Sequence, residues 1–526
     1  MPEKLRAAGV LALRFLFLTR YSWLLALAMV GLPPLALVAA PELLENLFVL
    51  DHPIQMLHVS WITMFCATSM ITTLHITTLN AIDRFDDYRA ACEDFHAAWG
   101  TNEPDDRPWC RRADTWSMLG LGLGTSLGMW YVVMAACVSR TAADPGPAWT
   151  EVTSGVQGFR TVAFAAWQQA FYGLSFTLGI LLTVYSVLVI RRGFFCCTPL
   201  HERPYRYQPH ELQIITPGVV SPNQTLLKFV AWLAGPGYFR TVVLRRRDEQ
   251  LSEHIVLAPG HAGMVMTTSL FGGWYGWTYL NGMRKGIVLD DSSPFPALFF
   301  GILSLQLIVL LLPGIAFFLD RHRIPILPAM MLVMALMYSV FGTDHFYELN
   351  PDPPIAQPYQ ALPWEEVLSK RAFWQDAEGK RTLVVVDASG GGIQASAWTT
   401  QVLTGLHEIY GEPFSRSIGL ISAVSGGSVG TVFYLSHRSD LSPDFDSEEG
   451  GTVLSPEAIE KIRLASRASG LEATCWGIAY PDTLRAVFPP LARESIDRGW
   501  SIEQSWRARM DSAGPGFGDL RLSQFG

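Results

Sequence analysis

The feature that most constrains this chain is a series of long apolar stretches in its first 345 residues. Seven stretches are candidate membrane-spanning helices, at roughly 22–40, 54–79, 116–138, 163–190, 262–282, 296–319 and 324–341. The third, fourth and sixth are nearly free of charge and long enough to cross about 30 Å of hydrocarbon as helices. The second and fifth are more polar, so six or seven spans are expected.

The overall composition agrees with a membrane environment. Hydrophobic residues make up 49% of the 526 residues and charged residues only 16%, against roughly 25% charged in a typical soluble domain. We therefore expect an integral, multi-pass membrane protein. Lys and Arg are concentrated in 1–21, 80–115 and 191–261, which predicts a cytoplasmic N-terminus. With six spans the C-terminal half would be cytoplasmic, and with seven it would be on the opposite side of the membrane. That choice stays open.

Charge and cysteine usage exclude some classes of function. The net charge of −8 argues against a nucleic-acid partner, because phosphate binding needs a basic surface. The seven cysteines are scattered and form no C-x-x-C pair. We expect no structural disulfide, no metal site and no organic cofactor.

A proline-rich stretch divides the chain. Prolines 351, 353, 354, 358 and 363 predict a stiff linker over residues 346–379. The predicted organisation is a membrane domain at 1–345, this linker, and an α/β domain at 380–526 whose charge density is ordinary.

The first chemical signal is a glycine turn between a strand and a helix. The β-branched run at 382–387 predicts a buried parallel strand, and a helix is expected from 393 to about 410. Between them lies Ser389-Gly390-Gly391-Gly392, whose backbone N–H groups at a helix start would suit a phosphate or a developing oxyanion. No Lys or Arg follows, and the spacing G-x-G-x-x-G is absent, so the known phosphate loops do not fit.

The second signal repeats this arrangement around a serine. Residues 417–424 predict a buried strand, and a helix to about 437 follows. Ala423-Val424-Ser425-Gly426-Gly427 is a G-x-S-x-G nucleophile elbow with alanine in the first place. Ser425 is the predicted nucleophile, and Ser428 is the alternative hydroxyl.

Together the two motifs resemble the patatin-like and cytosolic phospholipase A2 group. Ser389 to Ala395 is similar to the family's S-G-G-G-x-x-A stretch, and Ala423 to Ser428 is similar to its serine motif. The resemblance implies a three-layer α/β fold, with Gly390, Gly391 and Gly392 as oxyanion donors and Ser425 attacking a lipid ester. It also implies an aspartate in a later D-G-[GA] motif as the base. Gln394 stands where the family usually has Arg or Lys.

The base is the missing part of this pattern. A Ser-His-Asp triad is poorly supported, because His437 lies on the elbow's own helix and His407 precedes the serine. Seven aspartates follow Ser425, and none stands in D-G-[GA]: Asp440, Asp444, Asp446, Asp482, Asp497, Asp511 and Asp519. We expect the catalytic aspartate to lie beyond residue 526.

Two helix starts are also predicted in this half. Ser455-Pro456 has the pattern of an N-cap followed by proline at the first helical position. Ser501-x-x-Gln504 has the pattern of a capping box.

The expected protein is a multi-pass helical membrane domain followed by a three-layer patatin-like hydrolase domain. Its expected function is a membrane-anchored serine lipid acyl hydrolase, with membrane lipid as both substrate and surroundings. One alternative is a non-catalytic transporter or scaffold with a degenerate hydrolase domain. Another is a protease or thioesterase that uses the same elbow.

Overall fold

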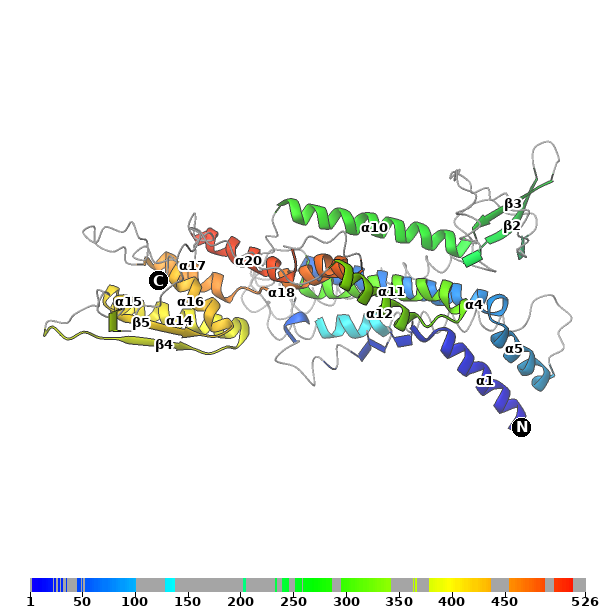
Figure 1. Ribbon diagram of the computed structural model, residues 1–526, viewed down its shortest axis with the longest axis horizontal. Helices are drawn as coiled ribbons and strands as arrows, with labels where there is room; N and C mark the ends of the chain where they lie inside the picture. The colour runs from blue at the N-terminus through cyan, green and yellow to red at the C-terminus, as the bar shows by residue number, and fades with distance from the viewer. Residues whose placement is uncertain are drawn as a thin grey trace, which may run out of the picture. The chain divides into compact units, whose positions relative to one another are not determined.

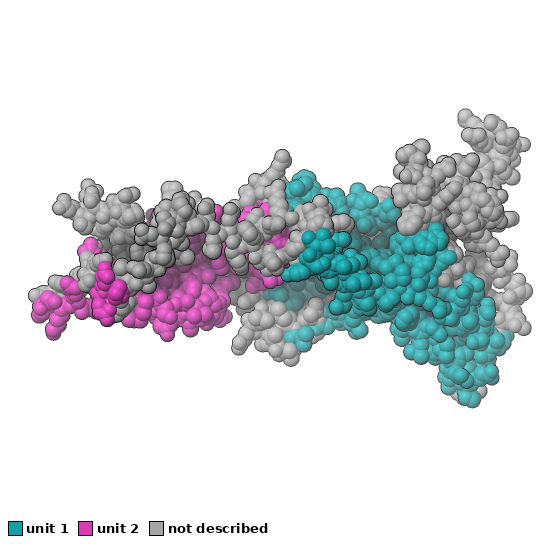
Figure 2. Space-filling model, in the orientation of Figure 1, with its two compact units in different colours: residues 1–281, 294–342 teal, residues 282–293, 343–526 magenta. Residues whose placement is uncertain are grey.

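A computed structural model describes two compact units of the chain. Unit 1 comprises residues 1–281 and 294–342, and unit 2 comprises residues 282–293 and 343–526 (Figure 2). The described residues are 2–21, 45–48, 53–100, 128–137, 202–204, 239–245, 251–257, 259–285, 295–341, 378–436, 454–487 and 496–513, with isolated positions within 23–35, 50, 232–233 and 363–366.

Unit 1 is mainly helical where it is described (Figure 1). Its helices are α1 (Pro2–Leu18), η1 (Glu45–Phe48), α4 (Pro53–Arg84), α5 (Asp86–Trp99), a helix at 128–137, α10 (Pro259–Lys285), α11 (Ala297–Leu319), η2 (Asp320–His322) and α12 (Ile326–Phe341). An antiparallel sheet joins β1 (Glu202–Pro204), β2 (Phe239–Arg245) and β3 (Leu251–Leu257).

Polar side chains tie the apolar helices of unit 1 together. Helix α11 packs along α4, and the buried Gln306 Nε2 donates to Ser69 Oγ over 2.9 Å. Trp130 Nε1 donates to Ser60 Oγ of α4, also over 2.9 Å. A buried polar group must find a partner when water is excluded, so these bonds fix which helix faces meet.

The prediction of a multi-pass membrane domain is wrong on this structure. Within the described residues, one segment is long and apolar enough to cross a membrane, Ala297–His322. Helix α12 is apolar but spans only about 24 Å. Helices α4 and α10 are less apolar, because they contain several residues with hydroxyl groups. The predicted span 163–190 and most of 22–40 lie outside the described residues.

Unit 2 contains the two motifs. Its elements are β4 (Val384–Ala388), α14 (Gly392–Tyr410), α15 (Glu412–Ser417), β5 (Ile418–Ala423), α16 (Gly426–Ser436), α17 (Pro456–Arg467), α18 (Leu471–Gly477), the π-helical η4 (Ile478–Asp482), α19 (Thr483–Val487) and α20 (Arg498–Ala513). Each predicted strand and helix around the glycine turn and the serine is confirmed to within two residues of its expected bounds.

Strands β4 and β5 form a two-stranded parallel sheet with its core on one face. Val386 and Ile421 pack against a cluster that includes Leu403 of α14 and Phe433 of α16. On the other face, Val385 is 57% exposed and Leu420 is 45% exposed. A three-layer fold covers both faces of a longer parallel sheet. Because the described helices cover one face of two strands, the predicted three-layer fold is wrong.

The two predicted helix starts have different outcomes. Ser455 is the N-cap of α17, and its Oγ accepts a hydrogen bond from Ala458 N over 3.2 Å, as predicted. The capping box at Ser501 is wrong, because α20 has already begun at Arg498. Asp497 occupies the cap position, where its Oδ1 accepts from Trp500 N over 2.7 Å.

Candidate active site

The candidate site lies where β4 and β5 end together. Ala388 pairs with Ala423 as the last residues of the two strands, and Val424 N donates to Ala388 O over 3.0 Å. Each strand then turns directly into a helix, α14 or α16 (Figure 1). The parallel pairing therefore brings the glycine turn and the serine to the same carboxyl edge, where α/β sheets bind ligands.

Ser425 has the backbone conformation of a nucleophile elbow. Its φ is 53°, in the left-handed region that non-glycine residues rarely occupy. Such a conformation costs on the order of 1–3 kcal/mol, so the surrounding structure must hold it. Two hydrogen bonds do so, from Gly427 N to Val424 O (3.0 Å) and from Val429 N to Ser425 O (3.2 Å). The serine is exposed at the tip of the turn.

Glycines on α16 allow the two turns to approach closely. A methyl group on Gly426 would overlap the carbonyl oxygen of Gly392, and one on Gly427 would lie 2.7 Å from the carbonyl oxygens of Ala388 and Ser389. The sequence motif identifies Gly426 and Gly427 as elbow residues and does not by itself indicate this packing role. The available signal was the spacing of Gly426, Gly427 and Gly430, which places three glycines on one side of a helix.

Gly390 lies directly beside the serine. A methyl group on Gly390 would lie 3.3 Å from the Cβ of Ser425. Gly392 has a φ of 60°, and Gly391 precedes α14 without a side-chain cap. Glycine adopts this conformation at no steric cost, which accounts for Gly392, whereas the close approach of Ser425 accounts for Gly390.

Free backbone donors lie in the two turns that meet at the serine. Among the described residues, the N–H groups of Gly390, Gly391, Gly392 and Gly426 have no hydrogen-bond acceptor. The first N–H groups of a helix lack intrahelical partners, and the helix dipole makes that end positive. The structure thus brings the predicted oxyanion donors next to the predicted nucleophile and adds Gly426, which sequence reasoning did not name. Gln394 is exposed in the first turn of α14.

The base is not present in the described part of the site. There, no side chain is within hydrogen-bond distance of Ser425 Oγ. Asp482 contacts Arg498 and Asp497 contacts Arg485 at the start of α20. The structure does not describe the side chains of the remaining candidates: Asp440, Asp444, Asp446, Asp511, Asp519 and His437.

His407 contacts Tyr434 in the core and not Ser425. It is buried near the C-terminal end of α14, with Nδ1 3.1 Å from the hydroxyl of Tyr434. It lies fifteen positions after Gly392 in the same helix, about 22 Å along the axis. His407 is therefore a packing residue of the core and not a partner of Ser425.

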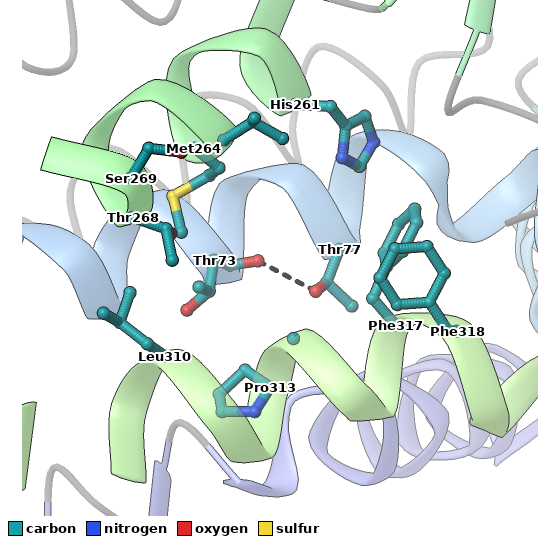
Figure 3. Close-up of a pocket in the computed structure, with 12 residues that line it drawn as sticks. Thr73, Thr77, His261, Met264, Thr268, Ser269, Leu310, Pro313, Phe317 and Phe318 are labelled. Carbon is teal, nitrogen blue, oxygen red and sulfur yellow. Dashed lines mark hydrogen bonds between the residues drawn. The ribbon is translucent and has the colours of Figure 1, made fainter. Parts of the chain in front are cut away.

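Unit 1 contains a separate cavity of about 310 Å³ between α4, α10 and α11 (Figure 3). Its wall is mostly apolar, and the hydroxyls of Thr73 and Thr77 donate within α4, to Met70 O and Thr73 O, each over 2.8 Å. His261 packs on Phe317 with ring centroids 4.6 Å apart. These polar groups are held by their own helices and by aromatic packing, and they do not form a catalytic arrangement. Nor does any group of three His, Cys, Asp or Glu side chains in the described chain suit a metal ion.

The candidate site in unit 2 is thus defined by its own geometry. Ser425 provides an exposed hydroxyl on a strained turn, and Gly390, Gly391, Gly392 and Gly426 provide backbone donors beside it. Comparison of the chain with protein-family models, curated proteins and solved structures finds no match.

Proposed function

We propose that this chain is a membrane-associated serine hydrolase that cleaves lipid esters with Ser425 as its nucleophile. The observation that carries the proposal is the φ of 53° at Ser425, directly beside Gly390. Backbone strain at a non-glycine residue concentrates at functional sites, where it holds a side chain in a required position. Packing alone would be served equally well by glycine at this position.

The proposed reaction uses the groups at the strand ends. Ser425 Oγ attacks the ester carbonyl carbon, and the carbonyl oxygen takes the negative charge. The N–H groups of Gly390–Gly392 and Gly426 stabilise that oxyanion, and one such donor typically contributes about 3–4 kcal/mol. The Oγ proton passes through a base to the departing alcohol, and water then hydrolyses the acyl-enzyme. The resemblance assigns the base to an aspartate.

Two observations favour a lipid as the substrate. The segment Ala297–His322 is long and apolar enough to cross a bilayer. In unit 2, the outer side of α14 exposes Trp398 (70%) and Ile409 (72%), with Val402 between them at helical spacing. Exposed tryptophan and aliphatic side chains on one helix face are typical of surfaces that rest on the bilayer interface.

The experiment compares hydrolysis by the full chain in lipid vesicles with that by two serine variants. Ser425→Ala should lower phospholipid ester hydrolysis on the order of 10⁴-fold or more, whereas Ser428→Ala should leave it within a few-fold of the native rate. Acyl thioester and peptide substrates, tested in parallel, should be cleaved more slowly than the phospholipid. Equal hydrolysis by the Ser425→Ala protein would overturn Ser425 as the nucleophile, and no hydrolysis by the native chain would favour the non-catalytic transporter or scaffold.

A further inference from the structure

A second pocket in unit 1, of about 590 Å³, lies where α1, α5, η2 and the start of α12 meet. Its wall combines charged side chains with apolar ones such as Leu18, Ile326 and Leu327. A cavity lined by both charged and apolar side chains suits an amphiphile better than a small polar solute.

The acidic side chains of the pocket are largely paired. Arg20 Nη2 lies 2.7 Å from Asp320 Oδ1, and these side chains are only 28% and 13% exposed. The Arg20 guanidinium also stacks on the ring of Tyr21. Arg14 faces Asp87 across a longer 3.7 Å gap. These pairs cancel most of the negative charge in the wall.

Two arginines remain without a carboxylate partner in the described part of the chain. Arg321 donates only to the carbonyl oxygen of Trp232, over 3.4 Å, and Arg323 forms no ion pair there. Both are exposed. Arg323 also has a φ of 56°, a conformation that glycine or asparagine adopts more readily. The pocket wall therefore includes two guanidinium groups that have no carboxylate partner in the described chain and can bind an anion.

The position of these arginines on the chain matches the level of lipid headgroups. Helix α11 has 23 residues and is about 34 Å long, slightly more than the roughly 30 Å hydrocarbon core. Arg321 and Arg323 lie two and four residues beyond its last residue, Leu319. Beyond them, α12 exposes apolar side chains, including Leu327 (48%) and Met331 (71%).

We propose that this pocket binds the phosphate headgroup of an anionic membrane lipid. Arg321 and Arg323 hold the phosphate through charge-assisted hydrogen bonds, and an acyl chain lies along Leu327 and the outer surface of α12. The proposal rests on the placement of α11 in a bilayer and is independent of the role of Ser425.

The test is a binding titration of the full chain in detergent, in a Ser425→Ala background so that no ester is cleaved. The probes are short-chain phosphatidic acid, the matching diacylglycerol, and inorganic phosphate. Phosphatidic acid should bind at least tenfold more tightly than the other two. The double variant Arg321→Gln, Arg323→Asn should weaken phosphatidic acid binding at least fivefold. Asparagine is chosen at position 323 because it tolerates the left-handed backbone there. Arg6→Gln, an exposed charge on α1 outside the pocket, should leave it unchanged.

A further variant guards against misfolding of the double variant. Asp87→Asn removes a negative charge from the pocket wall, so it should tighten phosphatidic acid binding severalfold. Equal binding of phosphatidic acid and diacylglycerol would overturn the proposal. It would also be overturned if inorganic phosphate bound as tightly as the lipid, if Arg6→Gln weakened binding as much as the double variant, or if Asp87→Asn did not strengthen it.

Discussion

The Cα atom of Gly426 faces the carbonyl oxygen of Gly392 with no room for a side chain between them. These are the first residues of α16 and α14, so the contact joins the two helix starts directly. It fixes the separation between the serine turn and the glycine turn. The geometry of the proposed oxyanion site therefore depends on a glycine that follows the nucleophile, as well as on the glycines that donate to it.

Gly426→Ala should disable the site while leaving most of the fold intact. The added methyl group would push the Gly392 carbonyl away and move the donors relative to Ser425, and displacements of about 1 Å can cost 100-fold in rate. We expect labelling of Ser425 by a fluorophosphonate to slow by about that factor, with the circular dichroism spectrum preserved. Native labelling rates in this variant would show that the contact does not position the site.

Gly430→Ala and Gly405→Ala should change stability in opposite directions. A methyl group on Gly430 would overlap the carbonyl oxygen of Ser396, where α16 meets α14, and overpacking typically costs about 1–3 kcal/mol. Gly405 lies within α14, and its nearest neighbouring atom would be 4.0 Å away, on Arg463. Alanine there should stabilise the helix by about 0.5–1 kcal/mol. Chemical denaturation of the two variants checks this pair, and a shift in the same direction for both would contradict it.

The strand, turn and helix around each motif could be predicted because the signals are local. A β-branched run, a glycine turn and a helical period follow one another within about 30 residues, and β4 and α14 lie close to their expected bounds. The contact between Gly426 and Gly392 could not be predicted, because it depends on how two helices pack. The sequence does not single out Asp497 as the cap of α20, because Asp497 and Ser501 are both acceptable cap residues and stand four positions apart.

The arrangement of the whole fold could not be predicted from the sequence. An apolar stretch favours burial in protein as much as in lipid, and α4 buries Ser69 against Gln306 of α11. The number of strands in a sheet depends on pairings between distant segments, and the three-layer expectation came from a resemblance that covers only the motifs. The exposed face with Val385 and Leu420 is the point at which that expectation is wrong.

The ion pair between Arg20 and Asp320 should matter more than the one between Arg14 and Asp87. Burial lowers the pKa of Arg20, but the hydrogen bond and charge of Asp320 outweigh it and the net pKa is raised, so the guanidinium keeps its charge. Arg20→Met leaves a largely buried carboxylate unpaired and should cost about 2 kcal/mol. Arg14→Gln breaks an exposed pair and should cost less than about 0.5 kcal/mol. Thermal unfolding in detergent measures both, and equal losses would contradict the ranking.

Cys475 should resist alkylation until the pH is high. Burial, and next the negative charge of Glu472, raise the pKa of its thiol to about 11. At pH 8 it should react with iodoacetamide on the order of 100-fold more slowly than in the denatured chain. Because the folded pKa is raised, the protonated thiol contributes its full stability below the ordinary pKa of about 8.5. This contribution is lost as the pH rises toward 11. Peptide mass mapping gives the rate, and equal rates in the folded and denatured chain would contradict the burial.

The most direct test of the account is covalent capture of Ser425. A fluorophosphonate probe reacts with an activated serine and not with an ordinary surface hydroxyl, so labelling of the full chain reports the nucleophile itself. The account predicts one phosphonylated serine, located by peptide mass mapping at Ser425, retained in Ser428→Ala and absent in Ser425→Ala. Labelling that persists in Ser425→Ala, or a native chain that stays unlabelled, would contradict it.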